Sequence, residues 1–115
     1  MKPIQGIPMA EAGWVRVAAA ADIPEGEVRA MRLGEREIAL YHLPGGEFCA
    51  SDNICTHEYA QLSDGWLEDG CIECPLHAGR FDVRTGKGQG APIDKDLEVF
   101  ETRLEGGDIH IRLPG

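Results

Sequence analysis

The chain has 115 residues, of which 43% are hydrophobic and 27% charged, a composition typical of one globular domain and not of a disordered chain. Eleven Lys and Arg residues stand against twenty Asp and Glu, and the formal charge of -9 argues against nucleic acid or anionic membranes as partners. The chain starts without a basic segment followed by an apolar run, and no stretch approaches the roughly 18 apolar residues of a spanning helix. We therefore expect a soluble cytoplasmic protein, in which cysteines are better interpreted as metal ligands than as disulfides.

Short segments in which apolar and polar residues alternate follow one another along the chain, a pattern typical of β-strands. Strands are predicted over residues 14–18, 27–33, 37–41, 48–50, 71–73, 78–83, 97–102 and 109–113. No amphipathic stretch of helical length is present, although the alanines at 18–21 could form one helical turn that Asp22-Ile23-Pro24 would end. Short strands separated by regular turns predict an all-β fold, a small antiparallel sandwich or barrel in a single domain over 1–115.

The part of the chain poorest in strand pattern lies between about residues 51 and 92. Within it, residues 62–70 carry two glycines and are predicted to form loop and turn. Loops on a rigid β scaffold are where functional side chains concentrate. We therefore expect two loops to meet at one end of the domain and to form a binding region over about 51–92.

Each of these loops offers one cysteine and one histidine, as Cys55, His57, Cys74 and His77 in the pattern C-x-H-x16-C-x-x-H. Thiolates suit zinc and iron–sulfur sites, and imidazole replaces thiolate on one iron in a Rieske-type [2Fe–2S] centre. The two cysteines would then bind one iron and the two histidines the other. Neutral imidazoles make the cluster less negative, so Rieske potentials span roughly -150 to +300 mV, against about -400 mV for plant-type ferredoxins.

Zinc is the rival metal, because it also accepts two cysteines and two histidines in a tetrahedron. Zinc fingers usually separate the two ligand types into different halves, whereas here each half is mixed. Cys71 and Cys74 form a C-x-x-C pair, so spacing alone also permits a zinc site of Cys71, Cys74 and His77. A thioredoxin-like redox role for that pair would need a βαβ context, which the sequence lacks.

The two loop motifs, with Gly79-Arg80-Phe81-Asp82 and Thr85-Gly86 after them, resemble Rieske-type ferredoxins. More specifically, they are similar to the ferredoxin components of bacterial aromatic-ring-hydroxylating dioxygenases of the naphthalene and biphenyl type. The resemblance implies a Rieske fold with a two-loop cluster-binding subdomain and one [2Fe–2S] cluster held by Cys55, His57, Cys74 and His77. It also implies a monomeric one-electron carrier with no active site of its own, which takes electrons from an NAD(P)H-dependent flavin reductase and passes them to a terminal oxygenase. The alternatives are the small Rieske-type subunit of a multisubunit reductase, such as an assimilatory nitrite reductase, and a zinc-stabilised interaction domain.

Four positions near the ligands refine this resemblance. The resemblance to respiratory Rieske proteins places Ala60 and Leu76 where those proteins have disulfide-forming cysteines. It places Gly79 where they have a serine whose hydroxyl would donate to a cluster sulfur. Fewer hydrogen bonds to the sulfurs lower the potential, so we expect a value toward the low end of the Rieske range. Glu58 stands where the family usually has glycine and would change the docking surface beside His57.

Several other side chains carry structural expectations. Trp14 and Trp66 are predicted to anchor the core, with a cover over the cluster as the alternative for Trp66. Cys49 and Cys71 are predicted to pack as small buried hydrophobic residues. Residues beside the ligands are predicted to shield the cluster and form part of the docking face: Tyr59, Pro75 and Leu76. The acidic balance suits a partner with a basic surface, because complementary charge speeds encounter.

Overall fold

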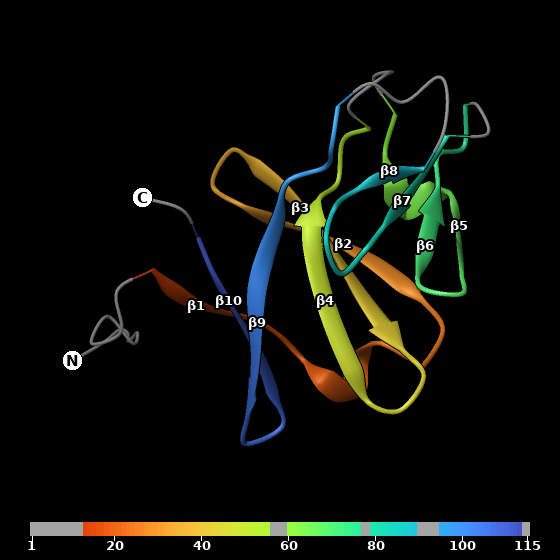
Figure 1. Ribbon diagram of the computed structural model, residues 1–115. Helices are drawn as coiled ribbons and strands as arrows, with labels where there is room; N and C mark the ends of the chain where they lie inside the picture. Colours follow the sequence, from red (N-terminus) through yellow and green to blue (C-terminus); the bar gives the residue numbers. More distant parts are fainter. Residues whose placement is uncertain (1–12, 56–59, 77–78, 90–94, 114–115) are drawn as a thin grey trace.

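The computed structural model describes residues 13–55, 60–76, 79–89 and 95–113, and over these ranges the chain forms two antiparallel sheets (Figure 1). The larger sheet has the strand order β1-β10-β9-β4-β3-β2 and the smaller one the order β5-β6-β7-β8. The larger sheet consists of β1 (Trp14–Ala19), β2 (Val28–Leu33), β3 (Arg36–Leu43), β4 (Glu47–Asp52), β9 (Val99–Glu105) and β10 (Asp108–Arg112). The smaller sheet consists of β5 (Trp66–Glu68), β6 (Cys71–Glu73), β7 (Arg80–Asp82) and β8 (Gly88–Gln89). The predicted all-β antiparallel fold is confirmed.

Two short 3-10 turns complete the described elements, η1 (Ala20–Asp22) and η2 (Leu62–Asp64). The helical turn predicted within the alanine run forms as η1 and ends at Ile23, which returns to extended backbone before Pro24. The prediction of loop and turn throughout 62–70 is wrong at β5, which pairs with β6 from Trp66 opposite Glu73 to Glu68 opposite Cys71. A strand of three residues shows too few alternations to be recognised, and it is the pairing with β6 that defines it.

The turn between β5 and β6 explains why this hairpin forms. Asp69 and Gly70 both have positive φ, 55° and 78°, as a two-residue type I′ hairpin turn requires. Asp-Gly is among the strongest short hairpin signals, because both residues tolerate the left-handed region better than most. The signal was therefore present in the sequence at the position where loop was predicted.

Strand β3, next to the edge strand β2, is buried on both faces and separates two apolar clusters. Ile38 and Leu40 face one side, and Ala39, Tyr41 and Leu43 face the other, as the two-residue period of a strand dictates. The first cluster lies on one side of the larger sheet and contains Ile23, Ile38, Leu40, Ala50, Phe100, Ile109 and Ile111. The second lies between the two sheets and contains Tyr41, Leu43, Cys49, Cys55, Leu62, Ile72, Cys74, Phe81, Val83 and Leu97. The small sheet therefore packs onto the larger one through the cluster that contains both predicted cysteine ligands.

The structure corrects the packing prediction for Trp66. Trp66 is 59% exposed, so its predicted role as a core anchor is wrong. It lies in a cross-strand row with Glu73 and Arg80, and the row buried beneath the sheet contains Leu67, Ile72 and Phe81 instead. The pairing of β5 with β6 decides which of its side chains face the core. The sequence of a three-residue strand does not reveal this pairing.

The other three packing predictions, for Cys49, Cys71 and Trp14, have different outcomes. Cys49 is buried as expected, whereas Cys71 is only half-buried opposite Glu68 and Asp82 on the outer face of the small sheet. Trp14 is half-buried beneath the guanidinium of Arg103, whose central carbon lies 4.3 Å from the ring centroid. In the described part of the chain, no helix has the length and apolarity that a bilayer crossing would require.

Candidate metal centre

Both predicted cysteines open loops that are closed in the same way. The backbone N–H of Cys55 donates to the carbonyl of Ala60 over 2.9 Å, and the backbone N–H of Cys74 donates to the carbonyl of Gly79 over 2.9 Å. Each loop thus returns to its cysteine after five residues, and the closing residues are two of those singled out in the sequence. His57, Glu58 and Tyr59 in the first loop and His77 in the second lie outside the described residues.

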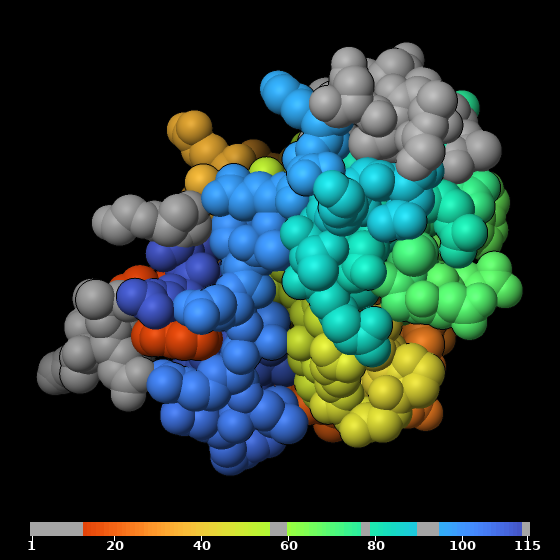
Figure 2. All heavy atoms as spheres, viewed as in Figure 1, coloured from red at the N-terminus to blue at the C-terminus, as the bar shows by residue number. Residues whose placement is uncertain are grey.

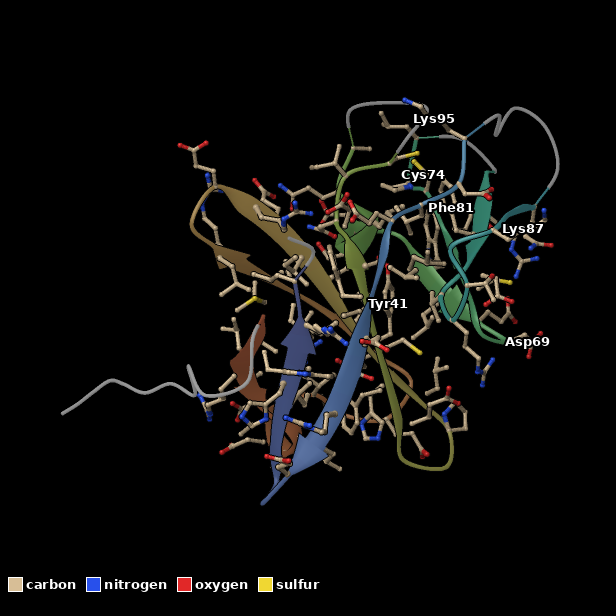
Figure 3. The ribbon with its side chains drawn as sticks, turned by 60° about the vertical axis from the view of Figure 1, so that its left-hand side comes forward. Tyr41, Asp69, Cys74, Phe81, Lys87 and Lys95 are labelled. Carbon is tan, nitrogen blue, oxygen red and sulfur yellow. The ribbon has the colours of Figure 1, made fainter. Side chains whose placement is uncertain are left out.

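The two cysteines are buried in one apolar environment. Cys55 is 4% exposed and Cys74 is 0% exposed, and both belong to the cluster between the sheets. Figure 3 shows Cys74 close to the ring of Phe81, at the end of the small sheet remote from the turn residue Asp69. Two buried thiols, delivered by two similar loops into one apolar cluster, fit the thiolate half of a Rieske-type centre.

Within the described residues, no three His, Cys, Asp or Glu side chains gather into a metal site. A four-ligand site at Cys55 and Cys74 therefore needs ligands from the remaining loop residues, where the sequence places His57 and His77. The alternative zinc site fits poorly, because Cys71 lies on the outer face of β6 while Cys74 is fully buried. The two side chains point to opposite faces of the sheet, which also argues against a C-x-x-C disulfide between them.

Cys49 is a further buried thiol in the same cluster, and its chemistry differs from that expected of a ligand. Burial and the nearby Glu47 carboxylate raise the pKa of the Cys49 thiol to about 11. At neutral pH this side chain is therefore protonated, whereas a metal ligand has to be a thiolate. Its place in β4, opposite Tyr41 in β3, is that of a packing residue.

Asn53 holds the entrance of the first loop and was not identified from the sequence. Its Oδ1 accepts from the backbone N–H of Ser63 over 2.8 Å, and its Nδ2 donates to Ser63 Oγ over 3.1 Å. Its own backbone N–H donates to the carbonyl of Glu37, and its carbonyl accepts from the N–H of Leu62. These bonds fasten the chain entering the loop, two residues before Cys55, to the chain leaving it. An Asn at the end of a strand and before a loop was the available signal, since Asn commonly bonds nearby backbone.

A second set of buried polar groups links β3 to the end of β4. Tyr41 is fully buried, and its hydroxyl donates to Ser51 Oγ over 2.8 Å, while Ser51 Oγ donates to the carbonyl of Asp52. Burial raises the pKa of Tyr41 well above its ordinary value, so the phenol stays neutral. The bonds connect β3 to the end of β4 immediately before Asn53.

Gly65 allows the chain that follows the first loop to pack closely against Glu73, the residue before Cys74. A Cβ on Gly65 would lie 1.9 Å from the carbonyl oxygen of Glu73, a separation that no side chain can occupy. The N–H of Gly65 donates to the carbonyl of Leu62, which ends η2 at this point. Glycine is therefore required here for the close contact between η2 and the residue before Cys74.

The comparisons with known proteins agree with this geometry. A family model described as the Rieske [2Fe-2S] domain matches residues 13–101. The chain is 45% identical over 100 residues to the ferredoxin component of the naphthalene 1,2-dioxygenase/salicylate 5-hydroxylase systems of a Ralstonia species, covering 87% of this chain and 95% of that protein. The structure of a complex of reduced oxygenase and oxidised ferredoxin in carbazole 1,9a-dioxygenase contains a chain that is 37% identical, with a TM-score of 0.80 and coverage of 89% of this chain and 94% of that one. A protein described as the small subunit of an NADH-dependent nitrite reductase from Mycobacterium tuberculosis has a TM-score of 0.80 over 89% of this chain and 96% of its own, but its 20% identity shows a shared fold alone.

Proposed function

The chain belongs to the Rieske [2Fe–2S] domain family, and on this premise we propose that it is a ferredoxin of an aromatic-ring dioxygenase system. It would take single electrons from an NAD(P)H-dependent flavin reductase and deliver them to the terminal oxygenase. The family gives the cofactor, one [2Fe–2S] cluster of Rieske type. The observation that carries the proposal is the pair of identically closed loops with buried cysteines, in a chain 45% identical to a ferredoxin component.

We assign the ligands to Cys55 and Cys74 on one iron and to His57 and His77 on the other. The C-x-H-x16-C-x-x-H spacing and the burial of both cysteines support the assignment. When bound, the cluster supplies a one-electron couple whose potential depends on the ligands, the hydrogen bonds to its sulfurs and its exposure. The ligand-binding region would be about residues 51–92 of a single domain.

The contribution of the other residues is to hold the ligands and keep water away from them. Leu62, Ile72 and Phe81 are fully buried in the cluster that contains both cysteines. Gly79 offers no hydroxyl where respiratory relatives have a serine, so a low potential within the Rieske range follows. Potentiometry of the purified protein would check this, and a strongly positive midpoint would contradict it.

The chain itself would catalyse no reaction, since the oxygen chemistry belongs to the oxygenase that accepts the electron. We expect a monomer that binds neither nucleic acid nor membrane, because a shuttle has to dissociate from each partner in turn. A cytoplasmic location follows from the proposal, since the reductase would draw on NAD(P)H.

The proposal is tested first by the iron and sulfide content of the protein and then by electron transfer. Iron and acid-labile sulfide analysis should give about two of each per chain, and one zinc without sulfide would refute the cluster. The purified protein should then be reduced by NAD(P)H through a flavin reductase and should support turnover of a terminal oxygenase. Gel filtration should give a stable, cluster-loaded protein on its own, and a chain that requires a large reductase subunit for stability would instead indicate a fixed subunit.

A further inference from the structure

The exposed apolar residues of the small sheet gather at its loop end. Among the described residues, the exposed large hydrophobic side chains are Trp66 at 59%, Leu76 at 63% and Leu104 at 51%. Trp66 pairs with Glu73, and Leu76 follows Glu73 by three residues. Paired Cα atoms lie about 5 Å apart, and three residues span at most about 11 Å, so Trp66 and Leu76 flank the same short stretch. Leu104 lies in the β9–β10 hairpin, in the other sheet.

Trp66 stands on the outer face of the small sheet, at the rim of a surface hollow. The residues of this sheet form a continuous part of the surface, coloured green to teal, beside β4 and β9 (Figure 2). A hollow of about 340 Å³ separates Trp66 and Leu67 from residues 26–29 at the edge of β2. An indole at such a rim is available to a partner, because it is held by a strand and yet mostly in solvent.

The charges around Trp66 differ from those of the larger sheet. On the larger sheet carboxylates are neutralised by arginines, in the ion pairs Arg16–Asp108, Arg32–Glu37, Arg36–Asp52 and Arg112–Glu101. Four carboxylates on the outer face of the small sheet and in its flanking turns have no ion-pair partner among the described residues: Asp64, Glu68, Asp69 and Glu73. Arg80 follows Glu73 in the same cross-strand row. Two further arginines lie nearby, but Arg29 is paired with Glu27 and Arg84 with Glu47, so the excess charge stays negative. Asp22, Glu25 and Glu35, beside the larger sheet, also have no ion pair among the described residues, so the small sheet is distinguished by combining such carboxylates with an exposed indole.

We propose that this surface, called here the Trp66 face and defined as Trp66, Leu76 and those four carboxylates, docks the terminal oxygenase. The partner's surface would present arginine and lysine side chains around an apolar hollow that receives the indole. A buried tryptophan is a frequent anchor of interfaces, a guanidinium packs favourably over its ring, and complementary charge orients the encounter. The inference rests on the proposed function and adds where the partner binds.

The surface area that a stable interface buries also indicates that the partner contacts more than the two cysteine loops. A standard interface buries about 800 Å² on each partner and involves roughly 20–30 residues a side. The two loops, 55–60 and 74–79, supply too few residues for such an area. A partner that covers Leu76 has to extend over neighbouring surface, and the Trp66 face adjoins the second loop directly through Glu73 and Cys74.

The test compares Trp66→Ala with Leu104→Ala, a matched truncation of an exposed apolar side chain on the other sheet. Oxygenase turnover is measured against ferredoxin concentration with the reductase in excess. Trp66→Ala should raise the KM for the ferredoxin about tenfold or more and leave kcat unchanged at saturation, while Leu104→Ala should leave both unchanged. The visible spectrum and midpoint potential of each variant, which docking does not alter, should equal those of the wild type.

A charge variant tests the same face independently and remains informative if Trp66→Ala does not retain its cluster. Glu68→Lys should raise the same KM and weaken its salt dependence, whereas Glu101→Gln, which removes a paired carboxylate, should not. A KM within twofold of the wild type for both Trp66→Ala and Glu68→Lys would overturn the inference. If the KM for the ferredoxin rises only in its reduction by the reductase, the face binds the reductase and not the oxygenase. That result would also overturn the inference. Failure of the proposed function looks different, since the wild type itself would then deliver no electrons.

Discussion

At the scale of single residues, the Asn53 side chain supports the base of the first loop. It is fully buried, and both of its amide atoms bond Ser63 across the base of the loop. Asn53→Ala should leave the N–H of Ser63 without its acceptor and lower the free energy of unfolding by about 1–3 kcal/mol. It should also shorten the lifetime of the cluster, because the chain entering the loop at Cys55 loses its attachment.

Ser63→Ala is the matched control for this prediction. It removes the Nδ2 to Oγ bond but keeps the bond from the Ser63 backbone, so its cost should be nearer about 0.5–1.5 kcal/mol. Urea unfolding and the decay of the visible absorption would measure both effects. Equal losses for the two variants would mean that the backbone contact to Asn53 contributes nothing.

At the scale of elements, the two sheets are joined far from the loops by one bidentate ion pair. Arg84, after β7, donates through Nε and Nη2 to both carboxylate oxygens of Glu47 at the start of β4, over 2.9 to 3.1 Å. The Arg84 guanidinium lowers the pKa of Glu47 below its ordinary value. A lowered folded pKa adds stability that is fully present above the unfolded pKa, near 4.5, and is lost as the pH falls through the folded pKa.

Arg84→Gln should therefore lower the urea midpoint at pH 7, by a modest amount because both side chains are exposed. The difference from the wild type should shrink as the pH falls below about 4.5, where Glu47 becomes protonated in the unfolded chain and then in the folded one. Arg112→Gln, which breaks an ion pair within the larger sheet, provides the comparison. A difference that stays constant from pH 7 to pH 3 would show that Arg84 acts through packing and not through Glu47.

The elements also show how much of the fold can be predicted from the sequence. Long alternating segments were predicted correctly because each period places its apolar residues on one face, and the two cysteine loops were located by ligand spacing. The strand β5 was missed although Asp69-Gly70 signalled its hairpin, and Trp66 was placed in the core because its face depends on the pairing with β6. Asn53 was missed because its partners lie ten residues away, across a loop closure that local pattern does not contain.

At the scale of the whole molecule, the formal charge of -9 is distributed unevenly. Among the described residues, arginines pair with many carboxylates of the larger sheet, while four carboxylates of the small sheet and its flanking turns have no ion pair. A field with this asymmetry orients the protein as it approaches a basic partner, with the small sheet leading. Docking should then be faster than for a neutral protein of the same size.

The second-order rate constant for electron transfer should therefore decrease as ionic strength rises. The Debye length shortens from about 30 Å at 0.01 M to about 10 Å at 0.1 M and about 3 Å at 1 M, so the steering field is progressively screened. We expect a decrease of about tenfold or more over this range in stopped-flow mixing with either partner. The midpoint potential has to be followed in the same buffers, so that a change in driving force is not mistaken for one in encounter. A rate that stays flat with salt would mean that apolar contacts around Leu76 control docking and that the acidic surface serves solubility alone.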